Sequence, residues 1–283
     1  APLGTSHALP LPEPPPMAML HKGDTLGKTG DPAAALETYD ALIARFGDSD
    51  ATPLQEWVAI AMLNKGVMLD KTSDLAAALE TYDALIARFC DSDALPLQEQ
   101  VARAKVSLAN HLINTGSETD RSEALLKSAT ESHGELAYAN LFWLYVASKE
   151  FSKARETLPH LEEMPIEGRA LMDAALAVQA ENFGSATQHL DKALQGSLVQ
   201  KSWDFTDDLA RLLRLSIAAG LGERLLDWFE KTRLADRYAP INAALKAAVQ
   251  GKARLLDVNP ETRHAAEIIL PRLINAQTPE KSN

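Results

Sequence analysis

The stretch "HKGDTLGKTGD" (residues 21–31) contains the Gly-Lys-Thr of a phosphate-binding loop. In such a loop the pattern G-x-x-x-x-G-K-[ST] lets glycine amides and a lysine hold phosphate groups. Counting back from Gly27, the first glycine belongs at position 22, but this is Lys22, and Gly23 is one place out of register. The preceding "LPEPPPMAML" does not suit a buried strand, because prolines do not fit a central strand. An NTPase is therefore the weakest of three hypotheses for this chain.

No other group of side chains has the spacing of a catalytic or metal centre. The seven histidines are scattered, and none has a second His or a Cys three or four residues away, whereas zinc needs three or four converging ligands. His160 and Glu163 lie one helical turn apart, which is common on solvated helices. No serine lies in a G-x-S-x-G turn, and no two carboxylates share an apolar setting that would separate their pKa values. We expect no enzymatic activity, no catalytic residues, no metal and no cofactor.

Composition and charge predict a folded cytoplasmic protein that binds neither nucleic acid nor a membrane. The chain of 283 residues is 46% hydrophobic and 24% charged, as is ordinary for soluble domains. Its formal charge of -11 argues against nucleic-acid binding, which needs clustered Lys and Arg. The single cysteine, Cys90, excludes an intrachain disulfide and fits a reducing compartment. No apolar run has the length of a membrane span, and residues 1–16 lack the layout of a signal peptide.

The strongest pattern in the sequence is an internal repeat with an offset of 43 residues. The run "AAALETYDALIARF" occurs at residues 33–46 and again, without a difference, at residues 76–89. The flanking segments align with the same offset, and a third, more divergent copy continues at residues 104–117. Self-similarity at a fixed period indicates a repeat array, in which each unit buries its apolar face by stacking on its neighbours.

Each repeat unit is predicted to be a pair of helices. Apolar residues of the second copy recur at helical spacing, and the chain has no run of alternating polar and apolar residues. The turn between the two helices is "DKTSD", where Ser73 or Asp74 can accept hydrogen bonds from the first turn of the second helix. Pro53 and Pro96 mark the starts of long first helices, and the one after Pro53 is expected at about residues 53–72.

These helix pairs resemble tetratricopeptide repeats (TPR), which place a small residue in the first helix and a small, an aromatic and an apolar residue in the second. The matching positions are Gly23, Gly66 and Ala109 in the first helices, and Ala35, Ala78, Tyr39, Tyr82, Leu42 and Leu85 in the second. The resemblance implies an all-α fold, an α-solenoid in which antiparallel helix pairs stack into a right-handed superhelix. The first two units are about nine residues longer than the usual unit of about 34.

The resemblance extends, with decreasing strength, to residue 232. Residues 141–161 and 174–194 fit the same template, and residues 206–232 form a plausible sixth helix pair. The predicted organisation is a Pro-rich flexible tail at 1–16, about six TPR-like helix pairs at 17–232, C-terminal capping helices at 233–274 and a second tail at 275–283.

The TPR resemblance also implies a concave groove lined by first-helix residues. The positions that match the ligand-facing ones of the family are Asn64, Arg103, Ser107, Asn110, Asn140 and Trp143. Amides, an arginine and a tryptophan could hold an extended peptide by hydrogen bonds and one aromatic anchor. Trp143 lies in the apolar run "LFWLYV", however, and is explained slightly better as a core residue.

The leading hypothesis is a non-catalytic scaffold or adaptor that binds a partner protein or peptide on the concave face of a TPR-like solenoid. The alternatives are a sensor or regulatory arm of a larger multidomain enzyme or assembly, suggested by the Pro-rich start of the chain, and the NTPase. The identity of the partner and the oligomeric state are left open by the sequence.

Overall fold

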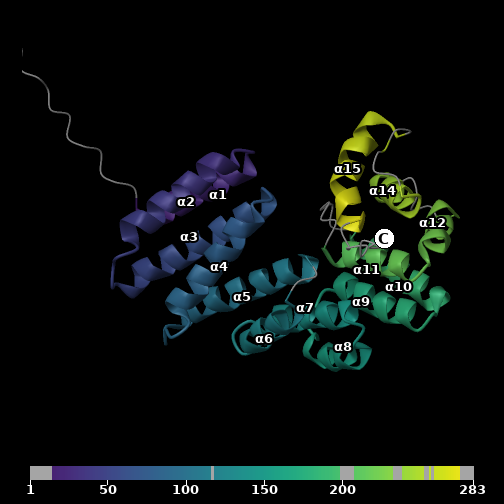
Figure 1. Ribbon diagram of the computed structural model, residues 1–283, viewed down its shortest axis with the longest axis horizontal. Helices are drawn as coiled ribbons and strands as arrows, with labels where there is room; N and C mark the ends of the chain where they lie inside the picture. Colours follow the sequence, from purple (N-terminus) through teal and green to yellow (C-terminus); the bar gives the residue numbers. More distant parts are fainter. Residues whose placement is uncertain are drawn as a thin grey trace, which may run out of the picture. The chain divides into compact units, whose positions relative to one another are not determined.

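The computed structural model describes residues 15–115, 118–197, 207–231, 238–251, 255 and 258–274. All regular elements in these residues are helices (Figure 1). None of the described helices combines the length and the apolar character that crossing a membrane requires. The chain divides into two compact units, residues 1–111 and 112–283, and each is described by itself. The predicted tail at 275–283 and all but the last two residues of the tail at 1–16 lie outside the described residues.

The first unit consists of long antiparallel helices that stack in chain order (Figure 1). These helices are α1 (Pro16–Lys28), α2 (Pro32–Phe46), α3 (Thr52–Lys71), α4 (Leu75–Phe89) and the part of α5 (Leu95–Thr115) up to His111. Helix α1 packs against α2 and α3, α2 packs against α3, and α3 packs against α4. The predicted all-α fold of stacked helix pairs is thus confirmed in this unit, and α3 begins and ends one residue before its predicted bounds.

Short turns separate the two helices of each pair, and both copies build them in the same way. The side chain of Asp31 accepts a hydrogen bond from the backbone N–H of Ala34 at 3.1 Å, and that of Asp74 accepts one from Ala77 at 3.4 Å. The residue before each aspartate has a positive φ, 90° at Gly30 and 64° at Ser73. The predicted cap at Asp74 is therefore confirmed, whereas Ser73 forms the left-handed corner of the turn.

Close contacts between small residues and tyrosines hold each pair together. A Cβ atom added to Gly23 would lie 2.5 Å from Cε1 of Tyr39, and one added to Gly66 would lie 2.5 Å from Cε1 of Tyr82. Both tyrosines are almost fully buried, with 1% and 0% of their surface exposed. Glycine lets the two helices approach until the ring fills the space between them, which is the role that the TPR resemblance gives to these positions.

The described α-helices of the second unit have 7 to 15 residues. They are α6 (Thr119–Ala129), α7 (Gly134–Ala147), α8 (Phe151–Thr157), a 3-10 turn (Leu158–His160), α9 (Ile166–Gln179), α10 (Phe183–Ser197), α11 (Asp207–Ala218), α12 (Gly222–Lys231), α14 (Ala239–Val249) and α15 (Pro260–Ile274). Asn259 is the N-cap of α15, and its side chain accepts a hydrogen bond from the N–H of Thr262 at 2.9 Å. Helix α11 contacts α7 and α9, and α15 packs on both α11 and α14.

Candidate functional site

Two of the predicted groove residues, Asn64 and Ser107, occupy equivalent positions of successive first helices, 43 residues apart. The amide nitrogen Nδ2 of Asn64 donates a hydrogen bond to Oδ1 of Asp24 in α1 at 3.0 Å. Asn64 and Ser107 are also near the phenols of Tyr39 and Tyr82, respectively, and each lowers the pKa of its tyrosine. Asn64 therefore connects α3 to the preceding repeat, and Ser107 of α5 lies near the tyrosine of its preceding repeat.

Both tyrosines donate hydrogen bonds to first-helix carboxylates. The hydroxyl of Tyr39 lies 2.6 Å from Oδ1 of Asp24, and that of Tyr82 lies 2.9 Å from Oδ2 of Asp70. The two aspartates are 46 residues apart and not 43, so the second carboxylate lies nearly one helical turn later in its copy. Since side chains three residues apart share a helix face, either position can reach the buried phenol.

The hydrogen-bonded pair of Tyr82 and Asp70 also contacts a third helix, α5. Asp70 presents its other oxygen, Oδ1, to Nδ1 of His111 in α5 at 2.8 Å, and only 7% of the His111 side chain is exposed. We name Asp24, Tyr39 and Asn64 the first polar joint, and Asp70, Tyr82, Ser107 and His111 the second polar joint. Each joint ties a helix pair to the first helix of the next unit.

The environment of the joints keeps both phenols protonated. Burial raises the pKa of Tyr39 far above its usual value, and the hydrogen bond and charge of Asp24 raise it further, against a smaller opposite effect of Asn64. Burial is also the largest cause of the raised pKa of Tyr82, followed by the charge and hydrogen bond of Asp70, while Ser107 lowers it. At neutral pH these groups act as hydrogen-bond donors between repeats.

The raised tyrosine pKa values predict a loss of stability in alkali. Above about pH 10 the unfolded chain releases its phenolic protons while the folded chain keeps them, so the free energy of unfolding falls as pH rises. Each tyrosine lowers the free energy of unfolding by up to about 1.4 kcal/mol per pH unit in this range. Urea titrations at neutral and alkaline pH measure this slope. Tyr39→Phe combined with Tyr82→Phe should make the slope shallower, and an unchanged slope would contradict the assignment.

Two further predicted groove residues, Arg103 and Asn110, lie on α5. They are four residues before and three residues after Ser107, which places all three on one helix face. The guanidinium of Arg103 is exposed, and its Nη1 lies 3.5 Å from Oε1 of Gln100. Asn110 is half-buried. The first unit therefore holds four of the six predicted residues, Asn64 in α3 and the other three along one face of α5.

The remaining two, Asn140 and Trp143, lie in α7 of the second unit and are buried, with 4% and 2% of their surface exposed. Nδ2 of Asn140 donates to the carbonyl of Leu136 at 2.8 Å, and its Oδ1 lies 3.5 Å from Nη1 of Arg211 in α11. Trp143 packs edge-to-face on Phe142, with ring centroids 5.3 Å apart. Both side chains are buried in this structure, and the contact with Arg211 turns Asn140 toward α11.

The Gly27-Lys28-Thr29 run has a geometry opposite to that of a phosphate loop. Gly27 and Lys28 end α1 and Thr29 follows its last turn, whereas a phosphate loop leads into the N-terminus of a helix, where N–H groups face the ligand. The C-terminal end presents carbonyl oxygens. Gly27 is also packed against the Met68 side chain. Residues 29–31 form the bend between α1 and α2, as the aligned residues 72–74 do between α3 and α4.

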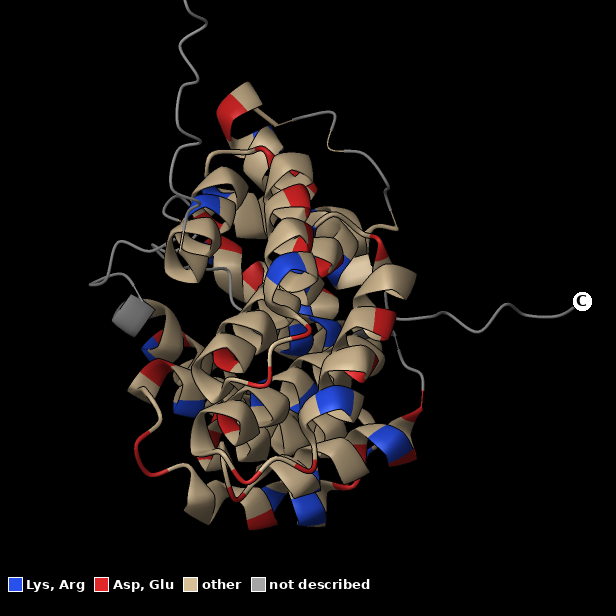
Figure 2. Cartoon of the chain, turned by 90° about the vertical axis from the view of Figure 1, so that its left-hand side faces the viewer, with Lys and Arg blue, Asp and Glu red and all other residues tan. Residues whose placement is uncertain are grey.

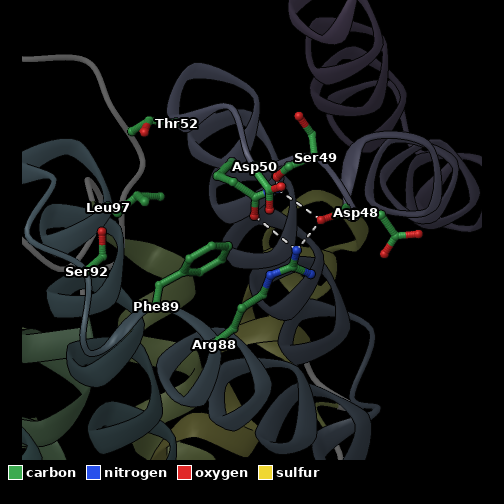
Figure 3. Close-up of a pocket in the computed structure, with 10 residues that line it drawn as sticks. Asp48, Ser49, Asp50, Thr52, Arg88, Phe89, Ser92 and Leu97 are labelled. Atoms are coloured by element: carbon green, nitrogen blue, oxygen red, sulfur yellow. Dashed lines mark hydrogen bonds between the residues drawn. The ribbon is translucent and has the colours of Figure 1, made fainter.

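A surface pocket of about 470 Å³ lies beside the connection between α2 and α3, and sequence reasoning did not single it out (Figure 3). We name it the loop pocket. It is lined by Gly47, Asp48, Ser49, Asp50, Thr52, Gln55, Arg88, Phe89, Ser92 and Leu97. The signal that could have found it is the pair of short acidic runs, "DSD" at 48–50 and at 91–93, which the repeat places at the same end of successive helix pairs.

The stacked helix pairs, joined by glycine–tyrosine contacts and polar joints, define a helical repeat protein. A model of the tetratricopeptide repeat family matches residues 17–49, which comprise most of α1, all of α2 and the start of the next turn. The chain thus contains a tetratricopeptide repeat, and this segment confirms the resemblance to the family. No curated protein and no solved structure matches the chain.

Proposed function

We propose that the chain is a non-catalytic scaffold or adaptor that binds a partner polypeptide on the first-helix face of its N-terminal unit. The observation that carries the proposal is the repeat itself, since a tetratricopeptide repeat at residues 17–49 is followed by a near-identical copy. Stacked repeats of this kind present matching residues at regular intervals along an extended surface. Such a surface suits an extended chain, whose own groups also recur at a fixed spacing.

The chemistry of this face supports hydrogen bonding to a peptide. Asn64 is half-buried, and the neighbouring Lys65 pairs with Asp40 of α2 at 2.6 Å. On α5, the exposed Arg103 and the half-buried Asn110 project from the face that also carries Ser107. Amides and a guanidinium supply donors and acceptors for the backbone of an extended peptide. The tyrosines and carboxylates of the polar joints bond to one another, and Arg103 on α5 is the exposed member of the predicted groove residues in this unit.

Capture of a partner tests this proposal. The full chain, immobilised and exposed to a lysate, should retain a specific polypeptide that mass spectrometry identifies. Arg103→Ala combined with Asn110→Ala should weaken its binding about tenfold or more, since a contact residue contributes roughly 1 kcal/mol or more where binding is concentrated. Calorimetry with the purified partner measures the change.

The control variant is Glu37→Ala combined with Glu80→Ala, at equivalent exposed positions of the second helices α2 and α4. It should bind the partner within about twofold of the unsubstituted chain. Equal weakening by both variants, or no effect of the α5 substitutions, would place the binding surface elsewhere. Failure to retain any specific polypeptide would argue against the scaffold itself.

A further inference from the structure

Helix α3 carries apolar side chains on the face that it does not use for packing. Its packed faces bury Val58, Ala59, Ala61, Met62, Leu63, Gly66, Met68 and Leu69. Trp57, Ile60 and Val67 are only half-buried, although the solvent side of a helix normally carries polar residues. Together with Asn64 they recur at intervals of three and four residues, which places all four on one side of the helix. We name Trp57, Ile60, Asn64 and Val67 the α3 stripe.

The neighbouring first helices are mostly polar at the same positions. The residues that correspond to the α3 stripe at the offset of 43 are Met17, His21 and Asp24 in α1 and Gln100, Arg103, Ser107 and Asn110 in α5. All of them except Gln100 are exposed or half-buried. Helix α1 packs against α3, and α5 contacts α3 through His111 and Asp70. The α3 stripe is therefore an apolar centre between two polar edges, as in a protein–protein interface.

Trp57 has the properties of an anchor for a partner. Among the described residues its indole N–H has no hydrogen-bond partner. A half-buried tryptophan offers a large apolar ring together with this donor, and tryptophan is enriched among the residues that contribute most to binding. Trp143, by contrast, has only 2% of its surface exposed. Trp57 is therefore the better candidate for the aromatic anchor of a first-helix face.

Two lysines at one end of the α3 stripe favour an anionic group. Lys28 of α1 and Lys71 of α3 are equivalent, exposed residues at the C-terminal ends of their helices. Neither forms an ion pair with any residue that the structure describes. The carboxylates within four residues of these lysines all accept hydrogen bonds from other groups of the chain; they are Asp24, Asp31, Asp70 and Asp74. The two ammonium groups are thus available to a carboxylate of a partner.

The opposite end of the α3 stripe carries both signs of charge. Glu56 in α3 and Glu99 in α5 are equivalent residues near the N-terminal ends of their helices, and Arg103 follows Glu99 by one turn. Within the described part of the chain none of the three forms an ion pair. Figure 2 shows further acidic residues, in red, in several connections between the helices. A segment bound along the stripe therefore has a preferred direction, with its acidic end at Lys28 and Lys71.

The dimensions of the α3 stripe match an extended peptide. From Trp57 to Val67 the stripe is about 15 Å long, at about 1.5 Å per helical residue, and Lys71 lies about 6 Å further along the helix. In an extended chain, the side chains on one side recur every ~6.6 Å. Three alternate residues therefore span the stripe, and the next residue on the same side reaches the lysines.

We propose that the α3 stripe binds an extended segment of the partner with three apolar residues at alternate positions and an acidic residue two positions beyond them. The apolar side chains pack on Trp57, Ile60 and Val67, and the carboxylate pairs with Lys28 and Lys71. This inference rests on the proposed function, because it takes the partner to be a polypeptide on the first-helix face. It adds the chemistry of the segment that is bound.

Capped synthetic peptides test the inference by NMR on the isotope-labelled full chain. The probe has three leucines at alternate positions, serines between them and a glutamate two positions beyond, and it is prepared in both chain directions. One direction should bind saturably in the range of ~1 mM and shift the indole N–H signal of Trp57 and the amide signals of residues 60–71. Replacing the glutamate of the peptide with glutamine should weaken binding up to about fivefold. This difference should vanish in Lys28→Gln combined with Lys71→Gln.

The repeat supplies matched substitutions for the α3 stripe. Ile60→Arg combined with Val67→Asn introduces the residues that α5 has at these positions and should weaken binding about tenfold or more. Trp57→Gln, also the α5 residue, should weaken binding about fivefold or more, so the test does not depend on the folding of one variant. The control, Leu75→Ser combined with Leu95→Ser, removes apolar side chains that are 42% and 78% exposed outside the stripe. It should change binding no more than about twofold.

Four results would overturn the inference: no saturable binding in either direction, equal binding of the glutamate and glutamine peptides, equal weakening by the stripe and control variants, or self-association in sedimentation velocity that Ile60→Arg with Val67→Asn abolishes. The last would assign the stripe to a second copy of the chain. The captured partner separates this inference from the scaffold proposal. If its binding falls with Arg103→Ala and Asn110→Ala but not with the stripe variants, the stripe inference fails and the scaffold stands.

Discussion

Asp70→Ala is expected to lower the free energy of unfolding by roughly 3 kcal/mol. The substitution removes the acceptor of the Tyr82 hydroxyl, whose residue is fully buried, and the contact with His111, whose side chain is 7% exposed. A buried donor that loses its partner costs about 1–3 kcal/mol, because it gave up its water on folding. Two groups depend on Asp70, so the expected loss exceeds that of an ordinary surface hydrogen bond. Chemical denaturation followed by circular dichroism measures it.

The control for Asp70→Ala is Glu80→Ala, which removes an exposed carboxylate from α4 without opening a buried contact. Its effect should stay within about 0.5 kcal/mol. A double-mutant cycle with Tyr82→Phe isolates the hydrogen bond between Tyr82 and Asp70. The coupling energy is the difference between the stability loss of the double variant and the sum of the losses of the two single variants. Coupling near zero would show that Asp70 stabilises the protein in another way.

The first repeat suggests a rescue of the Asp70→Ala variant. In the first repeat, Asp24 accepts the hydrogen bond of the tyrosine hydroxyl, and the residue at the position of Asp24 in the second repeat is Val67. Adding Val67→Asp to Asp70→Ala should therefore restore an acceptor for Tyr82 and recover part of the lost free energy. The contact with His111 would remain absent, so full recovery is not expected. Further destabilisation by Val67→Asp would show that the two carboxylate positions are not interchangeable.

The repeat explains how much of the fold could be predicted from the sequence. Identical runs at residues 33–46 and 76–89 must form the same local structure, and their apolar spacing is helical. Prolines and aspartates mark where helices begin, so the bounds of α3 were predicted within one residue. Glycine and tyrosine at fixed positions then define how the helices of a pair meet. All of these features are local, or recur at one offset, and a single sequence displays them.

The candidate site was less predictable because its determinants are not local. Asn140 and Trp143 have the spacing of groove residues, but both are buried, and Asn140 contacts Arg211 of α11, 71 residues later. No periodicity within α7 reveals that contact. The roles of the two carboxylates in the polar joints could not be predicted from the sequence for another reason. Asp24 and Asp70 do not align at the offset of 43, so an alignment of the two repeats hides their common role as acceptors for equivalent tyrosines.

Gly66→Ala is expected to destabilise the protein by about 2 kcal/mol, although alanine is the better helix former. By helix propensity alone, the substitution would stabilise α3 by about 0.5–1 kcal/mol. The added Cβ would lie 2.5 Å from Cε1 and 2.9 Å from Cδ1 and Cζ of Tyr82, well inside van der Waals contact. The ring is fully buried and bonded to Asp70, so it has no space to move into, and the two helices must separate. The steric effect therefore exceeds the gain in propensity.

The control for Gly66→Ala is Gly134→Ala at the start of α7, where an added Cβ would have no neighbour within 4 Å. It should leave stability unchanged or raise it by less than about 1 kcal/mol. Reducing the opposing side chain gives a second test. In the Tyr82→Leu background, Gly66→Ala should cost less than in the unsubstituted protein, because the smaller side chain leaves room for the methyl group. An equal cost in both backgrounds would show that the close approach of α3 and α4 is not what requires glycine at position 66.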